Sequence, residues 1–468
     1  MGSQRKEVQL FKFFICFFHK FPIKSYKLYN YIIIRLYYLF FNFSFQFIII
    51  IMSSKKQFIH TENHIILYPL NKVLSNITPT GTLPIYSNVL LEKQNDVLHL
   101  TTISEDIQIS TFASIKEFIS DDDAIKELKI TTNAKKLAVI LRSFDKNDNV
   151  NFSLENNNEI LHLQCGKSKF KLQTLPPEDF PNMEDIDDAD GENKQFTLSQ
   201  NCFKNLLKQT QYAVGVKDIR YYLNGLFLEI KPHKINCVAT DGHRMSVASQ
   251  ITIEELPTCD AIIPLKAITE IIKLISDNDD PITITINKSY AKFEFNNITL
   301  ISKLIDAKFP EYQSVIPNDF KLAFSADRKE LIKSIQRVAI INNDAHARGV
   351  LFEVNANNNN LKISTQNHDQ EIADVDLSIN TTIKDGADKD KEINIGFNIQ
   401  YLLDKLNNTA DDIVIFRLKN EDSSGLITGA SYTISDEDLL TLPSENDGET
   451  NDNITLCYEK YVVMPMRI

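Results

Sequence analysis

Asp241 and His243 are the residues of this chain whose types and spacing come closest to a catalytic pair. They lie two positions apart in Thr240-Asp-Gly-His-Arg244. An aspartate and a histidine so placed could act in acid/base catalysis or bind a metal ion. An Asp-Gly pair between two apolar segments is, however, first of all a tight-turn signal. We therefore interpret the segment as a hairpin turn, with an enzyme that uses Asp241 or His243 as the alternative.

Other motifs for catalysis or nucleotide binding are missing from the sequence. The 13 glycines form neither GxGxxG nor GxxxxGK[ST], and HExxH and GxSxG are also absent. Gly166-Lys-Ser168 has Leu161 where a phosphate-binding loop needs its first glycine. The six cysteines, at 16, 165, 202, 237, 259 and 457, form no CxxC pair, which is typical of reduced thiols in a cytosolic protein. We expect neither a cofactor nor a metal.

Positive charge is concentrated on segments with helical periodicity. The whole chain carries a formal net charge of −12, and residues 52–468 carry −18. Apolar residues recur at three- and four-residue spacing in 68–77, 132–144, 201–213, 264–276, 327–341 and 397–408, which predicts six helices. These segments contain 13 lysines and arginines but only four acids. An acidic protein with basic helices could attract phosphates at one surface and repel DNA elsewhere.

Within four of these helices the basic residues lie along one face. Their spacings of four, seven and eight residues produce such stripes: Lys329, Lys333 and Arg337; Lys204 and Lys208; Lys135 and Arg142; Lys266 and Lys273. Any single stripe could be an ordinary solvated helix face. Their recurrence predicts a surface that binds the nucleic-acid backbone without reading bases.

The helices belong to a module that occurs three times. A strand-like phrase ends at Glu92, Glu229 and Glu353, 137 and 124 residues apart, about the length of a domain. Each copy has a helix before the phrase, a strand pair after it and then a second helix. We therefore predict an α+β fold of three tandem domains, each with two helices packed on antiparallel sheet. The predicted domains are 52–192, 193–318 and 319–468, the last with an acidic insertion at 435–453.

Residues 1–51 do not fit this scheme. They are rich in Phe, Ile, Lys, Asn and Tyr, and Met52 follows as a natural start residue. We interpret the segment as an upstream extension that is absent from the working protein. The alternative is a membrane anchor through residues 32–51, since about twenty apolar residues are needed to span a bilayer.

Four further segments are distinctive: Arg220-Tyr-Tyr-Leu-Asn-Gly225, Val238-Ala-Thr-Asp-Gly-His-Arg244, Phe309-Pro-Glu-Tyr312 and Tyr461-Val-Val-Met-Pro-Met-Arg-Ile468. In order and spacing they closely resemble the bacterial DNA sliding clamp family, the beta subunit of DNA polymerase III, over essentially residues 57–468. The resemblance implies a cytoplasmic, non-catalytic processivity factor. It also implies a head-to-tail homodimer that closes a ring around duplex DNA, with helices lining the hole and sheets outside.

The resemblance also implies partners and sites. The partners would be double-stranded DNA, a second copy of the chain, the polymerase catalytic subunit, the clamp loader and other proteins with clamp-binding motifs. A hydrophobic peptide groove would involve Leu223, Thr240, Gly242, His243, Arg244, Met245, Pro310, Val315, Ser424, Val462, Val463, Met464, Pro465, Met466 and Arg467, with Arg244 and Arg467 as hydrogen-bond donors at the rim. DNA contacts would come from the helical stripes and from Lys217, Arg220, Tyr221 and Tyr222.

Some positions depart from the family pattern. Ser314 and Thr80 stand where arginines are usual, which weakens a groove contact and a DNA contact, and Lys217 replaces a neutral residue. Ile468 and Met245 replace leucines, which are mild changes.

Overall fold

The computed structural model describes residues 56–77, 83–94, 96–115, 128–155, 159–183, 193–341, 349–384, 392–431 and 457–468. The expectations for residues 1–51, for Thr80 and for the acidic insertion 435–453 lie outside these ranges. In the described part, no helix has the length and apolar character needed to cross a membrane. The anchor alternative, which concerns residues 32–51, therefore stays untested.

The three predicted modules are observed as three repeats with the same order of elements. Repeat 1 comprises β1 Lys56–Glu62, α3 Asn63–Val73, β2 Asn88–Gln94, β3 Val97–Ile103, β4 Ile107–Ser114, β5 Lys129–Asn133, α4 Ala134–Arg142, β6 Asn149–Glu155, β7 Ile160–Cys165 and β8 Ser168–Leu175. Repeat 2 comprises β9 Lys194–Ser199, α5 Gln200–Lys208, β10 Gly225–Lys231, β11 Lys234–Thr240, β12 Arg244–Ile251, β13 Cys259–Pro264, α6 Leu265–Leu274, β14 Pro281–Ile286, β15 Tyr290–Phe295 and β16 Ile298–Lys303.

Repeat 3 keeps this order and adds the short strand β21. It comprises β17 Leu322–Asp327, α7 Arg328–Val338, β18 Gly349–Asn355, β19 Asn360–Gln366, β20 Ile372–Ser378, β21 Asn380–Ile383, β22 Ile393–Asn398, α8 Ile399–Asn408, β23 Ile413–Leu418, β24 Gly425–Gly429 and β25 Cys457–Val463. Each repeat is thus one strand-helix-three-strand unit used twice. The α+β prediction is confirmed.

The helices begin where the sequence offers capping side chains. Asn133, Ser199, Asp327 and Asn398 each accept a hydrogen bond from a backbone amide in the first turn of the helix that follows. Such caps satisfy amides that have no partner inside the helix. Four of the six helices in the described ranges therefore start at a residue readable from the sequence.

The first helix differs from its predicted range. The prediction of 68–77 kept Pro69 near the helix start, where proline fits best. Helix α3 instead begins at Asn63, contains Pro69 inside, and ends in a 3₁₀ turn at Leu74–Asn76. Ile66 and Leu70 are fully buried. The apolar face therefore extends upstream, and its burial outweighs the hydrogen bond that Pro69 cannot donate.

The sheets run across the repeat boundaries. Strand β4 of repeat 1 pairs antiparallel with β16 of repeat 2, from Ile107 opposite Ser302 to Thr111 opposite Ile298. Strand β12 of repeat 2 pairs in the same way with β25 of repeat 3, from Arg244 opposite Val463 to Gln250 opposite Cys457. These pairings produce a 12-stranded and a 9-stranded sheet, and β20-β19-β18-β22 forms a third.

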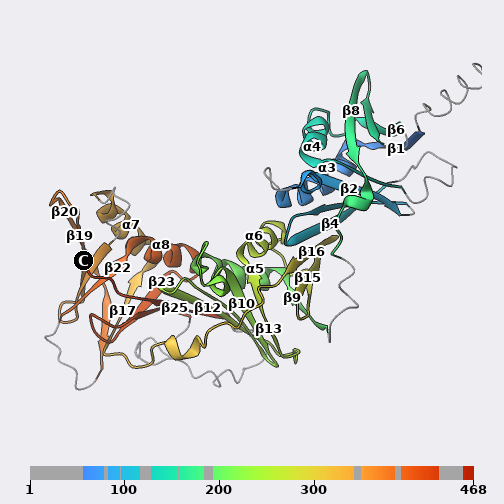
Figure 1. Ribbon diagram of the computed structural model, residues 1–468. Coiled ribbons are helices and arrows are strands. Elements are labelled where there is room, and N and C mark those ends of the chain that lie inside the picture. The colour runs from blue at the N-terminus through green and yellow to red at the C-terminus, as the bar shows by residue number, and fades with distance from the viewer. Residues whose placement is uncertain are drawn as a thin grey trace, which may run out of the picture.

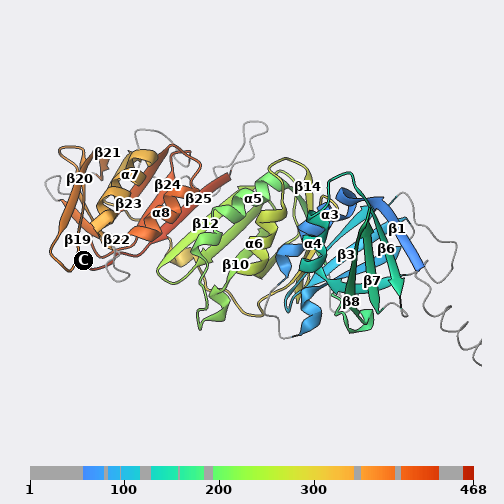
Figure 2. The same ribbon diagram turned by 90° about the horizontal axis from the view of Figure 1, so that it is seen from above.

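Because the sheets are continuous, all helices of the described part lie on the same side. Figure 1 shows an arc with α7, α8, α5, α6, α3 and α4 along its concave side and the strands along its convex side. Figure 2, turned by 90°, shows the helix pair of each repeat lying across its strands. One face of the molecule is therefore helical from end to end.

A buried ion pair joins α8 to the last strand. Lys405 Nζ lies 2.5 Å from Glu459 Oε1, and the two side chains are 0% and 8% exposed. Burial lowers the pKa of Lys405, and the charge of Glu459 opposes that change. Charges removed from water in this way are tolerated only as a pair.

We predict that Lys405→Met, which leaves Glu459 buried without its partner, lowers the free energy of unfolding of repeat 3 by about 3–5 kcal/mol. The double variant Lys405→Met/Glu459→Leu should recover most of that loss, because no charge is then left without a partner. Calorimetric unfolding of the two variants and the wild type measures both effects. A single variant as stable as the wild type would contradict the prediction.

Candidate functional site

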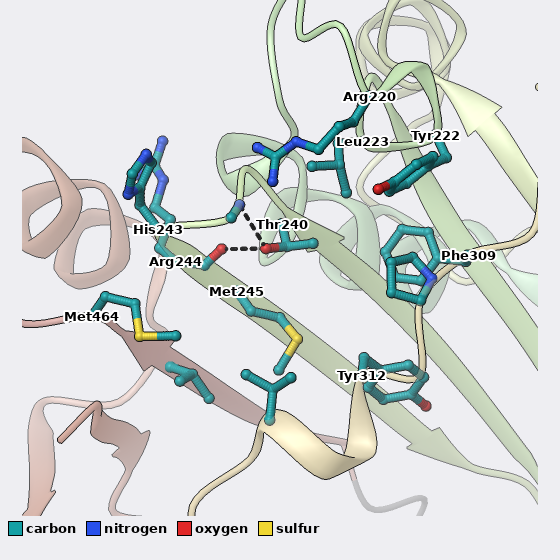
Figure 3. Close-up of a pocket in the computed structure, with 14 residues that line it drawn as sticks. Arg220, Tyr222, Leu223, Thr240, His243, Arg244, Met245, Phe309, Tyr312 and Met464 are labelled. Carbon is teal, nitrogen blue, oxygen red and sulfur yellow. Dashed lines mark hydrogen bonds between the residues drawn. The ribbon is translucent and has the colours of Figure 1, made fainter.

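A pocket of about 230 Å³ opens beside the turn between β11 and β12 (Figure 3). The turn, the end of β25 and the linker that leads into repeat 3 all contribute to its walls. Its lining consists of Arg220, Tyr222, Leu223, Thr240, Gly242, His243, Arg244, Met245, Phe309, Pro310, Tyr312, Val315, Val462 and Met464. Repeats 2 and 3 therefore build this pocket together.

Aromatic rings from the linker form one wall. Phe309 stacks on Phe227 of β10 with ring centroids 4.6 Å apart, and Tyr312 meets Phe227 edge-on. Tyr312 also donates a hydrogen bond to Glu229 Oε2 at 2.7 Å. These contacts fix the linker on the convex face of the sheet, so the wall is formed before any ligand arrives.

The mouth of the pocket is apolar and adaptable. Val315 is 43% exposed and Met464 is 41% exposed, although both are hydrophobic. Met245 lies at the pocket floor (Figure 3). Flexible methionines beside compact aliphatic groups suit varied apolar side chains of a peptide. The pocket is therefore suited to holding hydrophobic anchors rather than to carrying out a reaction.

The turn 240–244 is held by its own polar groups. Asp241 Oδ1 accepts hydrogen bonds from the amides of His243 and Arg244, at 2.9 and 3.0 Å, and Oδ2 pairs with Arg244 Nε. Thr240 Oγ1 donates to the Arg244 carbonyl and accepts from the Gly242 amide. Both oxygens of the Asp241 carboxylate are thus engaged in hydrogen bonds within the turn. This favours the hairpin interpretation over the catalytic one, and no cluster of metal-ligating residues occurs in the described ranges.

Gly242 is favoured in this turn because its φ is +87°, a conformation that side chains disfavour. The guanidinium of Arg220 lies close by, 2.9 Å from where a Cβ would be. Arg220 covers the glycine, donates to the Asp241 carbonyl at 3.1 Å and pairs with Asp218. Arg220 holds the pKa of Asp218 down at about 2.

Arg244 does not act as a donor at the rim, contrary to the expectation. Its side chain is only 9% exposed. Its guanidinium donates to Asp404 on α8 at 2.5 Å and to the Tyr212 carbonyl at 2.6 Å, and it lies 4.3 Å from the centroid of the Tyr401 ring. Asp404 and Tyr401, both in repeat 3, hold the positive charge of Arg244 away from the mouth of the pocket. No local motif in the sequence indicates these two partners.

Most of the predicted groove residues are brought together in this pocket. Ten of them line it: Leu223, Thr240, Gly242, His243, Arg244, Met245, Pro310, Val315, Val462 and Met464. Five others are not part of the lining: Ser424, Val463, Pro465, Met466 and Arg467. Side chains alternate along a strand, so Val463 points into the core while Val462 reaches the pocket.

The C-terminal tail leaves the pocket after Met464. The amide of Met464 donates to the His243 carbonyl at 2.9 Å, and the amide of Met466 donates to the Gly396 carbonyl at 2.9 Å. A Cβ on Gly396 would fall well inside contact distance of the Met466 carbonyl oxygen. The backbone of the tail thus packs directly on Gly396 of β22, and this contact directs the tail away from the groove.

Sequence reasoning missed four residues of the lining. Arg220 and Tyr222 were assigned to DNA, and Phe309 and Tyr312 were not assigned to a site. The motif Phe309-Pro-Glu-Tyr312 was a signal that could have revealed the aromatic wall. Tyr221, in contrast, is 58% exposed and lies outside the lining.

The basic stripes lie on the helices of the concave side, with one correction. Lys135, Arg142, Lys266, Lys273, Lys329, Lys333 and Arg337 are exposed. Lys204 is not: it is 8% exposed, and its Nζ donates to the Ile275 carbonyl at the end of α6 and pairs with Asp277, both at 2.9 Å. It caps a helix end, where a positive charge is favourable. Lys208 is half-buried beside it.

Some exposed cations have nearby partners. Lys273 pairs with Glu270 at 2.9 Å, Lys329 with Asp412 at 3.1 Å, and Arg142 donates to Asn71 at 2.5 Å. The Lys329–Asp412 pair is exposed and of a kind that contributes little to stability, whereas Lys273 pairs with a buried carboxylate, since the Glu270 side chain is only 6% exposed. The concave side therefore remains a positive surface in a chain of net charge −12.

Comparisons with known proteins agree with this architecture. Three family models match in order: the N-terminal domain of the DNA polymerase III beta subunit at residues 57–184, its central domain at 197–311 and its C-terminal domain at 313–441. The beta sliding clamp of Pseudomonas aeruginosa is 30% identical over 406 residues, which cover 86% of this chain and 98% of that protein. The Escherichia coli K12 clamp is 30% identical over 407 residues, 87% and 99% of the two chains.

Solved structures give the same result. A sliding clamp from P. aeruginosa bound to griselimycin has a TM-score of 0.74 and 28% identity, covering 88% of this chain and all of that one (100%). The clamp from Caulobacter crescentus has a TM-score of 0.73 and 26% identity at the same coverage.

We predict that Gly396→Ala dislodges the C-terminal tail, because the added methyl collides with the Met466 backbone. Overpacking of this kind costs about 1–3 kcal/mol, and it should raise hydrogen exchange at the amides of Met464 and Met466. Gly349→Ala is the matched control, since the atoms nearest its Cβ would be side-chain atoms of the tail, Ile468 Cγ1 at 3.1 Å and Met466 Cε at 3.5 Å, rather than backbone. Equal protection of the tail amides from hydrogen exchange in the two variants would contradict the assignment of Gly396 as the residue on which the tail packs.

Proposed function

This chain belongs to the DNA polymerase III beta subunit family, the bacterial sliding clamps, and on that basis we propose how its surfaces serve that function. Its helical, basic inner face would surround duplex DNA, and its pocket would hold partner peptides. The chain acts as an accessory subunit that keeps the polymerase on DNA, and not as an enzyme. The observation that carries the proposal is the continuous helical face with its exposed lysines and arginines.

The two ends of the arc are suited to join head to tail. Among the described strands, β20 pairs only with β19, and the 168–173 part of β8 pairs only with β7. These edges lie at opposite ends of the arc (Figure 1). The β8 edge exposes Lys169 and Lys171, and the β20 edge exposes Asp374 and Asp376. Free backbone groups and opposite charges make the edges complementary, so two chains would close a ring.

DNA would be held by topology rather than by tight contacts. Phosphate contacts from Lys135, Lys266, Lys333 and Arg337 are independent of base sequence and weaken as salt rises. The loop with Lys217 and Tyr221 would add exposed contacts, since Tyr221 offers a ring for stacking on a base. Weak and uniform contacts of this kind allow sliding along the duplex.

The pocket would receive the polymerase catalytic subunit, the clamp loader and other proteins that carry clamp-binding motifs. Its apolar lining and aromatic wall suit hydrophobic peptide anchors, with His243 at the mouth. The P. aeruginosa clamp is bound to griselimycin; we propose that this pocket binds griselimycin here, which makes it a probe. Because the partners are replication proteins, we place the protein in the cytoplasm.

We predict that Lys169→Glu/Lys171→Glu raises the dissociation constant of the dimer at least about tenfold, because like charges then face each other across the joint. Asp374→Lys/Asp376→Lys should do the same, and mixing the two variants should restore dimers. Sedimentation velocity measures the assembly. Asp279→Lys/Asp280→Lys, on an exposed loop of repeat 2, is the control. Unchanged dimers in either edge variant would refute the assigned joint.

A second prediction tests the ring itself. After loading by a clamp loader, the protein should stay on nicked circular DNA through gel filtration and be lost once the circle is cut open, because free ends release a topological link. Moderate salt should leave retention on the circle largely unchanged, since the link does not depend on counterion release. Equal retention on circular and linear DNA would overturn the proposal.

A further inference from the structure

The guanidinium of Arg244 connects the turn beside the groove to helix α8 of repeat 3. Its Nη1 donates to Asp404 Oδ2 at 2.5 Å, across 160 positions of the sequence. Its Nε pairs with Asp241 Oδ2 at 3.1 Å. Arg244 is therefore held between carboxylates of two repeats, with the face of the Tyr401 ring beside it.

Asp404 is itself held in place for this contact. Its Oδ1 accepts a hydrogen bond from Gln400, one turn earlier on α8, at 2.6 Å. Its other oxygen, Oδ2, is then directed to Arg244, and the side chain is 22% exposed. Hydrogen bonds between ionised groups are strong where water is largely excluded. The carboxylate therefore meets Arg244 in a fixed orientation.

The position of Arg244 affects the shape of the groove. Its carbonyl accepts from Thr240 Oγ1 at 2.7 Å, and its amide donates to Asp241 Oδ1 at 3.0 Å, so its backbone closes the turn. Met245, the next residue, lies at the floor of the pocket. Figure 3 shows Arg244 on the side of the pocket away from Phe309 and Tyr312. A guanidinium released from α8 would disturb this turn and bring a charge toward the apolar lining.

We propose that Asp404 is a positioning residue for the groove: it holds the guanidinium of Arg244 against α8 and thereby fixes the turn 240–244 that lines the pocket. This inference rests on the proposed function of the pocket as a ligand groove. Asp404 lies on a helix of the concave side, whereas the aromatic wall of the pocket lies on the convex side. The ion pair therefore links the face turned toward DNA with the face turned toward partners.

The test uses the full chain and griselimycin as the probe. Titration calorimetry measures griselimycin affinity for the wild type and for Asp404→Ala, Asp404→Asn and Asp404→Glu. Asp412→Asn is the matched control, because Asp412 is an exposed carboxylate of the same repeat that pairs with Lys329 far from the groove. Hydrogen exchange at residues 241–245 reports the turn directly, and thermal unfolding reports whether each variant is folded.

We expect about tenfold weaker binding for Asp404→Ala and a smaller loss for Asp404→Asn, which keeps an acceptor but loses the charge. Asp404→Glu should restore most of the affinity, and exchange in the turn should rise only in the weakened variants. If Asp404→Ala does not fold, Asp404→Asn decides. If the folded Asp404 variants bind griselimycin with the affinity of the wild type and show the same hydrogen exchange in the turn, the proposed role of Asp404 is wrong. Failure of the wild type itself to bind griselimycin would overturn the groove assignment instead.

Discussion

The structure depends on one constraint: the strand edges at repeat boundaries pair with each other. The β4–β16 and β12–β25 ladders turn three modules into continuous sheets. The helices of each repeat pack on the same side of these sheets, so the helical face extends from one end of the arc to the other (Figure 1). A strand shifted by one residue would turn its core side chains toward solvent, so the apolar pattern of these strands keeps the register. The inner helical face follows from this pairing of strands between repeats.

The boundary between repeats 2 and 3 combines stability and binding. Polar groups gather there in unusual density: the buried Lys405–Glu459 pair, the Arg244 cluster and the hydrogen bond from Tyr461 to the Tyr401 carbonyl. Buried charges cost free energy unless they are paired; the pairing of Arg244 with Asp404 crosses the boundary and constrains how the two repeats meet, while the Lys405–Glu459 pair fixes α8 on β25 within repeat 3. The pocket lies on this boundary, and its walls come from both sides. A groove built in this way requires the repeats to be held in one fixed arrangement.

Positive charge is concentrated on the helices of the concave side. Exposed lysines and arginines occur along these helices, while the chain as a whole is acidic. A ring with such a lining holds a duplex without gripping it, because counterion release acts equally at every position along the backbone. The interior is not uniformly basic: Lys204 and Lys405, both on helices of this side, are buried and serve the packing of the protein.

Local patterns in the sequence determined the repeats, the helices, the turn at 240–244 and the concentration of basic residues on helices. Each of these depends on neighbours within a few positions, through periodicity, capping or turn chemistry. The four distinctive motifs also located most of the pocket. Tertiary structure alone decided that Lys204 caps α6, that Arg244 meets Asp404, and that Gly396 seats the tail. The partners in these contacts are far apart in the chain, and pairing between distant residues leaves no local pattern, because it is set by how the sheets join and not by the residue's own segment.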